Sequence, residues 1–242
     1  MNASGNPMLT RIRQNARSIL TLNRDREYVL LRQMLDLQPH DRLLDLGSGD
    51  GFWTARFARH CAHVTGLEPG EQALAYAAQL HPHPRIDYVQ GIAEALPFPD
   101  ASFDKLVSVS SVEHFEDPRK SLREMKRVLR PGGRLALSVD SLLEENSPEG
   151  FRQWHKQRHY VTEYFSANTL EALLEEAGFR CEPERTVHLF RSRLAAGLRQ
   201  RFIRRPRLWL ALFPLFYGGV RLADRVLNTR HGQIVVVTAT RV

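Results

Sequence analysis

One stretch of the sequence, residues 43–51, limits the folds that this chain can adopt. It reads Leu-Leu-Asp-Leu-Gly-Ser-Gly-Asp-Gly, and a helical pattern follows over residues 54–60. A strand, a glycine turn and a helix in this order build nucleotide pockets at the carboxyl edge of parallel α/β sheets. The glycines allow a tight turn and a close approach to a ligand, because they have no Cβ atom. Phe52 stands where a dinucleotide fingerprint has its third glycine, which argues against NAD.

Apolar spacing along the rest of the chain alternates between helix and strand patterns. Helical spacing covers residues 8–37 and is stopped by Pro39. Ser166 caps a later helix that ends at Gly178. We also expect helices at 71–80 and 121–129, strands at 62–67, 86–90, 103–110, 134–139 and 233–240, and a sixth strand beginning near Phe179. This alternation predicts an α/β protein.

The motifs in residues 41–179, more than half of the chain, resemble those of the class I S-adenosylmethionine-dependent methyltransferases in order and spacing. Besides the glycine turn, they are Glu68 after the second strand, the segment 91–98, the pair Glu113-His114, and Leu-Arg-Pro-Gly-Gly at 129–133. The resemblance implies a Rossmann-like, seven-stranded, mostly parallel sheet with an antiparallel last strand and helices on both faces. It also implies transfer of a methyl group from S-adenosyl-L-methionine to an acceptor.

The resemblance further implies which residues hold the cofactor. Glu68 would accept hydrogen bonds from the ribose hydroxyls. An acid usually follows the glycine of the adenine-binding segment; here Ile92 stands instead and could stack on the ring, while the Ala93 amide could still reach it. The predicted cofactor contacts are Asp45, Gly47, Ser48, Gly49, Gly51, Glu68, Pro69, Ile92, Ala93 and Ser110. A ligand-free strand-to-helix connection and a surface acid are the alternatives for the glycines and Glu68.

Glu113 and His114 lie where the family places groups beside the transferred methyl. Histidine has an ordinary pKa near neutrality, so His114 is predicted to be the base for a hydroxyl acceptor. Glu113 would orient His114 or contact the amino group of the cofactor. Some ubiquinone-pathway members bind a divalent cation through Glu-x-x-Glu-His, but Ser110 replaces the first glutamate here. We therefore expect no metal.

The segment 140–165 is rich in aromatic and polar residues. In the family, extra segments between the fifth and sixth strands lie above the carboxyl edge, where the methyl acceptor binds. Trp154, His155, His159 and Tyr160 are therefore predicted to contact the acceptor, and plain packing is the alternative. His155 and His159 would share a helix face as metal ligands can, but no third ligand is near.

The formal net charge of +7 is concentrated in residues 191–225, which hold nine arginines and one acid, Asp224. Within this segment, residues 208–220 form a run of 13 uncharged residues that is too short to span a bilayer. We expect a helix or helical hairpin, broken by Pro214 and Gly218-Gly219, with its apolar side chains in the membrane interface and its arginines on anionic headgroups. A buried oligomer contact is the alternative. Nucleic acid is disfavoured, since the Asn/Asp-Pro-Pro-Tyr type signature is absent.

These observations predict an organisation for the whole chain. Residues 1–40 are helices that close over the cofactor or pack on the sheet, 41–190 form the core with an acceptor lid at 140–165, 191–228 are an insertion, and 229–242 carry the last strand. Two distant cysteines and a start without an apolar core indicate a cytoplasmic protein. The insertion would hold it as a peripheral protein on the inner face of the membrane. The expected reaction is O-methylation of a small or amphipathic acceptor: a lipid, quinone or lipid-linked sugar. The alternatives are a nucleic-acid methyltransferase that uses the arginine-rich insertion and a non-catalytic membrane adaptor that keeps a relic cofactor fold.

Overall fold

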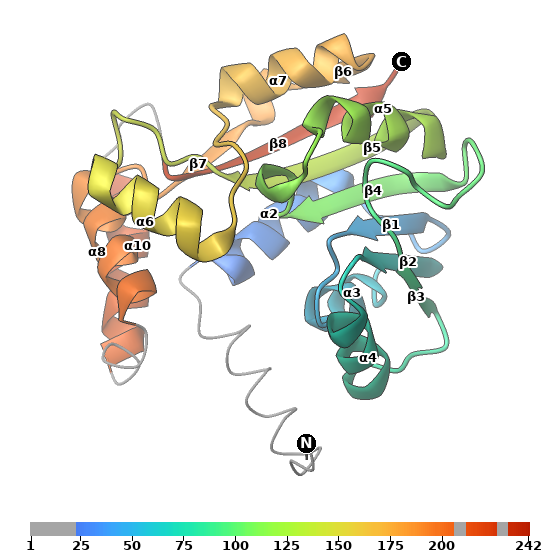
Figure 1. The fold of residues 1–242 in the computed structure, drawn as a ribbon, viewed down its shortest axis with the longest axis horizontal. Coiled ribbons are helices and arrows are strands. Elements are labelled where there is room, and N and C mark those ends of the chain that lie inside the picture. Colours follow the sequence, from blue (N-terminus) through green and yellow to red (C-terminus); the bar gives the residue numbers. More distant parts are fainter. Residues whose placement is uncertain (1–22, 206–211, 227–231) are drawn as a thin grey trace.

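A computed structural model describes residues 23–205, 212–226 and 232–242, and it shows one mixed sheet with helices packed around it (Figure 1). The sheet order is β3-β2-β1-β4-β5-β8-β6, and β7 pairs with β8. The strands are β1 Arg42–Leu46, β2 His63–Glu68, β3 Ile86–Gln90, β4 Phe103–Val109, β5 Leu129–Asp140, β6 Phe179–Cys181, β7 Val187–Leu189 and β8 Ile234–Arg241. Strands β1 to β5 are parallel, and β8 runs antiparallel to β5.

The predicted Rossmann-like fold is confirmed, but the described sheet has eight strands instead of seven. β6 and β7 lie on the same edge of β8, where β6 pairs with its carboxyl end and β7 with its amino end. The short helix η2, Pro183–Arg185, separates them. The proline cannot donate to a sheet hydrogen bond, so the edge strand is divided into two short pieces.

The helices are α2 Arg24–Leu35, α3 Phe52–Phe57, α4 Glu71–Leu80, α5 Pro118–Val128, α6 Glu149–His159, α7 Ala167–Glu176, α8 Arg193–Arg204 and α10 Phe213–Val226, with the short helix η1 at Val112–His114. Two predicted helix boundaries were wrong by three residues. α3 ends at Phe57 instead of residue 60. α5 begins three residues early, because Asp117 caps it by accepting from the Lys120 amide and a proline is tolerated in the first turn.

Residues 130–133, which the sequence places between a helix ending at 129 and a strand beginning at 134, are part of β5 in the structure. β5 begins at Leu129, which pairs with Phe103, and the register shifts before Arg134 pairs with Lys105. Gly132 has φ +74°, a conformation that favours glycine. The Pro-Gly-Gly sequence therefore makes an irregularity inside a longer strand.

Helices cover both faces of the sheet. Successive strand residues alternate between two apolar cores, as Leu106 and Val107 show on β4. One core includes side chains of α2, α3, α8 and α10, and the other includes side chains of α5 and α7. Burial on both faces accounts for the near-continuous apolar character of the central strands.

The insertion is a pair of helices, α8 and α10, that pack against each other. The predicted break at Gly218-Gly219 was wrong, since α10 continues through both glycines, and Pro214 lies in its first turn. Within the described ranges, no helix has the length and apolar content needed to cross a bilayer. Residues 1–22 and Trp209 of the predicted apolar run lie outside the described residues.

Candidate active site

The glycine turn between β1 and α3 has three residues in the left-handed region: Gly47 at φ +76°, Gly49 at +54° and Gly51 at +76°. A Cβ atom on Gly47 would lie 2.3 Å from the Ser111 Oγ, and one on Gly51 would lie 2.5 Å from the Tyr88 hydroxyl. Those two glycines are required by packing within the protein. A Cβ atom on Gly49 would meet nothing within 4 Å. Gly49 is therefore the position at which the turn leaves room for a ligand.

Glu68 lies at the end of β2, beside this turn. Its Oε2 accepts a hydrogen bond from the Gly49 amide at 3.2 Å, and its Oε1 accepts one from the Gly70 amide at 3.0 Å. Each carboxylate oxygen can accept two hydrogen bonds, so capacity remains for two hydroxyls of a ligand. The neighbouring Pro69 is exposed.

Two further residues of the segment 43–51, Asp45 and Ser48, have buried side chains. Asp45 is 2% exposed and accepts a hydrogen bond from the Thr54 hydroxyl at 2.7 Å, which ties the end of β1 to α3. Burial raises the pKa of Asp45 to about 6, and the charge of Glu68 adds to the shift. The Ser48 hydroxyl is buried without a hydrogen-bond partner in the described part of the chain. The cofactor contacts of both residues stay predictions.

The predicted adenine-binding segment, residues 91–98, follows β3, whose end is in register with that of β2, so that Glu68 pairs with Gln90. Ile92 is 50% exposed and forms an isolated bridge with Ala95, while Ala93 is 5% exposed. An exposed aliphatic side chain at this place suits the predicted stacking on a flat ring.

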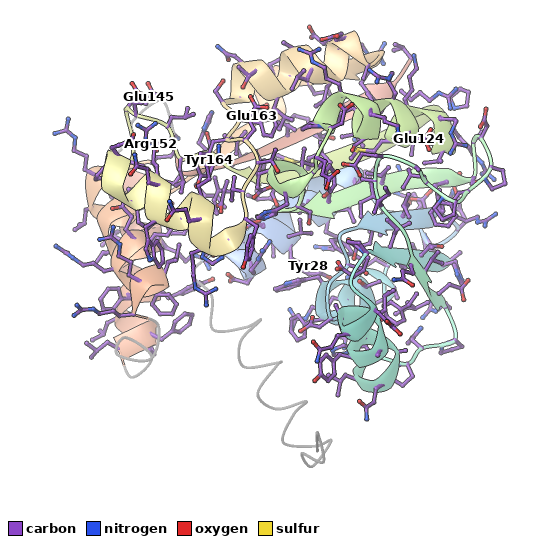
Figure 2. The ribbon with its side chains drawn as sticks, in the orientation of Figure 1. Tyr28, Glu124, Glu145, Arg152, Glu163 and Tyr164 are labelled. Carbon is purple, nitrogen blue, oxygen red and sulfur yellow. The ribbon has the colours of Figure 1, made fainter. Side chains whose placement is uncertain are left out.

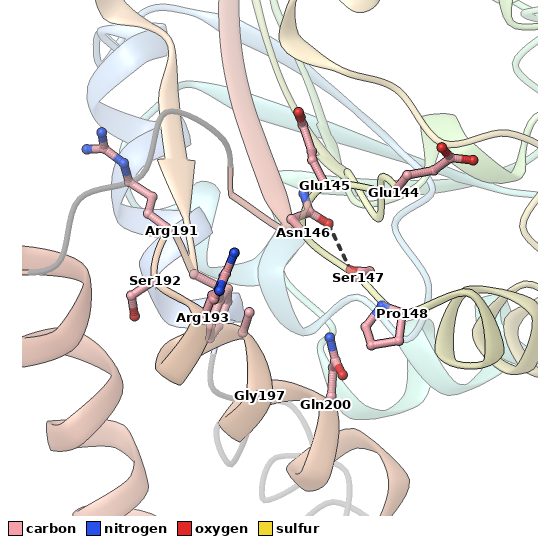
Figure 3. A pocket seen from close by; sticks show the side chains of 12 residues that line it. Glu144, Glu145, Asn146, Ser147, Pro148, Arg191, Ser192, Arg193, Gly197 and Gln200 are labelled. Carbon is pink, nitrogen blue, oxygen red and sulfur yellow. Dashed lines mark hydrogen bonds between the residues drawn. The ribbon is translucent and has the colours of Figure 1, made fainter.

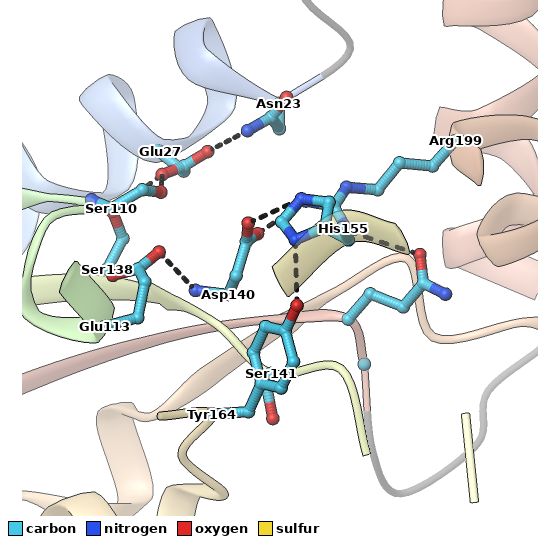
Figure 4. A network of polar contacts seen from close by, with 12 residues as sticks. Asn23, Glu27, Ser110, Glu113, Ser138, Asp140, Ser141, His155, Tyr164 and Arg199 are labelled. Atoms are coloured by element: carbon cyan, nitrogen blue, oxygen red, sulfur yellow. Dashed lines mark hydrogen bonds and ion pairs between the residues drawn. The ribbon is translucent and has the colours of Figure 1, made fainter. Parts of the chain in front are cut away.

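Ser110 lies at the end of β4 and donates a hydrogen bond to the Glu27 Oε2 at 2.8 Å. The Ser138 hydroxyl donates to the same oxygen at 2.6 Å (Figure 4). Glu27 is fully buried on α2, so this helix is fastened to the ends of two strands. Glu27 was not among the predicted site residues. The signal was an acid on the apolar stripe of α2, four residues before Leu31.

A second polar network surrounds Asp140, the last residue of β5 (Figure 4). The Arg199 guanidinium of α8 pairs with one Asp140 oxygen, and the His155 Nε2 lies 3.4 Å from the other. The Tyr164 hydroxyl is 2.9 Å from the His155 Nδ1. Figure 2 shows Tyr164 on the segment that follows α6. The same figure labels Tyr28 of α2, which is not part of this network and whose ring lies 5.3 Å from that of Trp53.

Protonation within this network follows from burial and charge. Burial alone would raise the pKa of Asp140, but the Arg199 charge holds it below its usual value. Burial lowers the pKa of His155 to about 4, so its ring is neutral at pH 7. The simplest assignment places the hydrogen of the neutral ring on Nε2, the nitrogen that faces the Asp140 carboxylate, and lets Nδ1 accept from the Tyr164 hydroxyl. Arg199 and Tyr164 were not predicted as site residues.

The Glu113-His114 pair divides into a buried and an exposed member. Glu113 is fully buried, and its Oε1 accepts a hydrogen bond from the Asp140 amide at 2.9 Å. Burial, followed by the charge of Asp140, raises its pKa to about 8. Its Oε2 has no partner among the described residues, so a contact with the cofactor's amino group stays a prediction. His114 is exposed, and its Nδ1 lies 3.4 Å from the Tyr160 carbonyl oxygen.

The four predicted acceptor residues are on or just after α6, near this pair. His155 is 4% exposed with partners on both ring nitrogens, which favours the packing alternative for this residue. Tyr160 is 85% exposed, and the rings of His155 and His159 lie 4.5 Å apart. Trp154 stacks on Phe151 at 5.8 Å. Acceptor contacts by Trp154, His159 and Tyr160 stay predictions.

A cavity of about 560 Å³ lies between the connection from β5 to α6 and the first turns of α8 (Figure 3). Glu144 and Glu145 line one part of it, and Arg191, Arg193 and Gln200 line another. The predicted cofactor and catalytic residues do not line this cavity, so it is separate from the candidate active site.

Comparisons with known proteins agree with this geometry. A family described as Methyltransferase domain matches residues 44–137. A 2-phytyl-1,4-naphtoquinone methyltransferase from Thermosynechococcus vestitus is 33% identical over 177 residues, which cover 64% of this chain and 77% of that protein. A 27-O-demethylrifamycin SV methyltransferase from Amycolatopsis mediterranei is 38% identical over 165 residues, which cover 64% of this chain and 58% of that protein. The chain spans less than two thirds of the length of three other relatives, at 33%, 64% and 54%.

The fold also matches solved structures. Phosphoethanolamine N-methyltransferase 2 from Haemonchus contortus, in complex with phosphomonomethylethanolamine and S-adenosylhomocysteine, superposes with a TM-score of 0.67 at 20% identity. The match covers 90% of this chain and 52% of that one, and at this identity it shows the fold alone. The family assignment rests on the sequence relatives, above all on the naphthoquinone methyltransferase, of which this chain covers 77%. The chain belongs to the class I S-adenosylmethionine-dependent methyltransferases.

Proposed function

We propose that the protein transfers the methyl group of S-adenosylmethionine to a hydroxyl group of a small amphipathic acceptor. The observation that carries the proposal is the arrangement at the carboxyl edge of the sheet. There the open position above Gly49 adjoins the Glu68 carboxylate. The exposed His114 follows β4, two strands from β2 in the sheet. Relatives named as acting on a phytyl-naphthoquinone and on a demethylrifamycin support an acceptor of this kind.

The residues at this edge fit the cofactor. The space above Gly49 would admit a ligand close to the backbone, and Glu68 keeps hydrogen-bonding capacity for the ribose hydroxyls. Ile92, half exposed beside the end of β3, offers an apolar surface for the adenine ring. S-adenosylmethionine supplies a methyl group that is already electrophilic. The protein then has to position the acceptor and remove its proton.

His114 is the group placed to take that proton. A carbonyl oxygen can only accept a hydrogen bond, so the His114 Nδ1 carries the hydrogen that points to the Tyr160 carbonyl at 3.4 Å. In the neutral ring the Nε2 is then the nitrogen that can accept the hydroxyl proton as the oxygen–methyl bond forms. Glu113 helps to position His114, because its carboxyl accepts a hydrogen bond from the Asp140 amide and so holds η1 against the end of β5.

The test compares lipid extracts by mass spectrometry from cells with the wild-type gene, without it, and with His114→Ala. We expect the wild type alone to yield a species heavier by one methylene group, and the purified variant to bind S-adenosylmethionine normally in calorimetry. Loss of the imidazole should reduce turnover by about 10² to 10⁴.

His40→Ala is the matched control, since His40 is exposed before the amino end of β1, away from the site. It should keep full turnover. Full methylation in the His114→Ala cells would show that the acceptor needs no base at this position. A methyl mark found on nucleic acid instead of on the lipid fraction would replace the proposed acceptor class.

A further inference from the structure

Helix α10 is apolar on two sides. Its inner side, with Phe213, Phe216 and Val220, packs on the core beneath the sheet. Its outer side shows Leu215, Leu222 and Val226, which are 74%, 64% and 66% exposed. Spacings of seven and four residues place these three on one stripe of the helix. Among the described residues only the inner side of α10 is covered, so the apolar stripe on its outer side faces solvent unless a partner binds there.

The same helical pair carries a cluster of exposed positive charge. The exposed arginines described on or next to α8 and α10 are Arg193, Arg201, Arg204, Arg205, Arg221 and Arg225. Asp224 is the one acid in this part of the sequence, and it is turned inward to accept hydrogen bonds from the Phe190 and Arg191 amides and to pair with Arg26. The exposed charge of the helical pair is therefore positive and is not compensated by its own acid.

We propose that the outer side of the α8–α10 pair binds a lipid bilayer that contains anionic lipids. Leu215, Leu222 and Val226 would enter the boundary between headgroups and acyl chains, and the flanking arginines would contact lipid phosphates. A nucleic acid would neutralise the arginines but leave the leucines in water. A bilayer accommodates both kinds of side chain at once.

The structure changes which residues of the insertion meet the bilayer. Phe213 and Phe216, which the sequence analysis expected in the interface, are half-buried against the core, and Arg199 is 2% exposed in the Asp140 network. Because Arg199 ties α8 to the last residue of β5, the bound surface is held close to the carboxyl edge of the sheet. The proposal does not depend on the identity of the methyl acceptor.

The experiment is flotation of the purified full chain with vesicles of pure phosphatidylcholine or of phosphatidylcholine with phosphatidylglycerol. The wild type should float with the anionic vesicles and more weakly with the neutral ones. Arg201→Gln/Arg225→Gln should weaken anionic binding about twenty-five-fold at about 0.1 M salt, about fivefold for each arginine. Leu215→Ser/Leu222→Ser should lose the binding that persists at about 1 M salt.

Arg123→Gln/Arg180→Gln is the matched charge control, since both arginines are exposed on α5 and β6. It should float like the wild type, and all variants should keep the wild-type circular dichroism and melting midpoint. A wild type that ignores anionic vesicles, or a leucine variant that floats unchanged, would overturn the proposal. So would a stable dimer that the leucine variant splits, because a second copy would then cover the stripe.

Discussion

Glu68 shows how a single side chain can serve both the turn and a ligand. Its two oxygens already hold the Gly49 and Gly70 amides, and their remaining capacity faces the predicted ribose site. Glu68→Ala should remove two charge-assisted hydrogen bonds to the cofactor, each worth about 1.5 to 3 kcal/mol. We therefore expect calorimetry to show S-adenosylmethionine affinity at least tenfold weaker.

Asp87→Ala provides the comparison for this variant. Asp87 is an exposed acid on the adjacent strand β3, where it pairs with His63. Its removal should leave the affinity for the cofactor unchanged. Equal affinities in the two variants would assign Glu68 to the turn alone and remove it from the cofactor site.

The site residues at the strand ends could be predicted from sequence, but their hydrogen-bond partners elsewhere in the chain could not. The positions of Gly49, Glu68 and His114 follow from the rule that parallel strands present their carboxyl ends at one edge. Ser110 was expected at the cofactor, and the structure shows its hydroxyl donating to Glu27, which lies 83 residues earlier. Pairing between residues so distant in sequence depends on how a helix packs, and local patterns carry no information about it.

At the scale of elements, η1 and β5 meet through Glu113, which makes stability depend on pH. Burial and Asp140 raise the pKa of Glu113 from 4.5 to about 8. Between these values the folded protein holds more protons than the unfolded chain, so stability falls as the pH rises. The lowered pKa of His155, from 6.5 to about 4, acts in the opposite direction only below pH 6.5. Above pH 6.5 the Glu113 effect therefore remains.

Urea titrations at several pH values can measure this effect. Between about pH 6.5 and pH 8, the free energy of unfolding of the wild type should fall by roughly 1 to 2 kcal/mol relative to Glu113→Gln. The glutamine keeps an oxygen for the Asp140 amide and does not titrate. Parallel pH profiles for the two proteins would show that Glu113 is ionised in the fold at neutral pH.

Helix α8 is fastened to the sheet by one buried ion pair. Arg199 and Asp140 have side chains that are 3% and 13% exposed. Arg199→Met should leave the Asp140 charge buried without its partner and cost about 3 to 5 kcal/mol in the free energy of unfolding. Arg201→Met, at an exposed position of the same helix, should change it by less than about 0.5 kcal/mol. Similar urea midpoints for both variants would contradict the role given to Arg199.

The elements of the core were more predictable than those of the insertion. Strand β3 and helix α4 begin and end where the sequence analysis placed them, because turn residues and apolar spacing mark both boundaries. The predicted break at Gly218-Gly219 failed, since packing of Phe216 and Val220 on the core holds the helix together despite the low helix propensity of glycine. Tertiary burial outweighed the local preference.

At the scale of the whole molecule, the inner and outer sides of the insertion could not be told apart from sequence. Residues 208–220 are apolar throughout, so they indicate burial without showing which residue faces the core. The described structure separates Phe213 and Phe216, which pack inward, from Leu215, which is exposed. That separation moves the expected bilayer contact from aromatic to aliphatic side chains.

Cofactor binding should also appear as stability of the entire fold, because the proposed site joins the ends of β1, β2 and β3. A ligand that binds only the folded state at about 100 times its Kd adds about 2.7 kcal/mol. For a domain of this size that corresponds to a rise in melting temperature of roughly 5 to 10 °C.

S-adenosylmethionine and S-adenosylhomocysteine should both produce this rise in a calorimetric scan, and Glu68→Ala should show a smaller one at the same concentrations. NAD should produce none, because Phe52, 7% exposed at the start of α3, occupies the place of the glycine that lets the helix of a dinucleotide site pack closely against its strand. A rise with NAD and none with S-adenosylmethionine would mean that the glycine turn serves a dinucleotide. The proposed methyl transfer would then lose its cofactor, whereas bilayer binding by the α8–α10 pair would stand on its own observations.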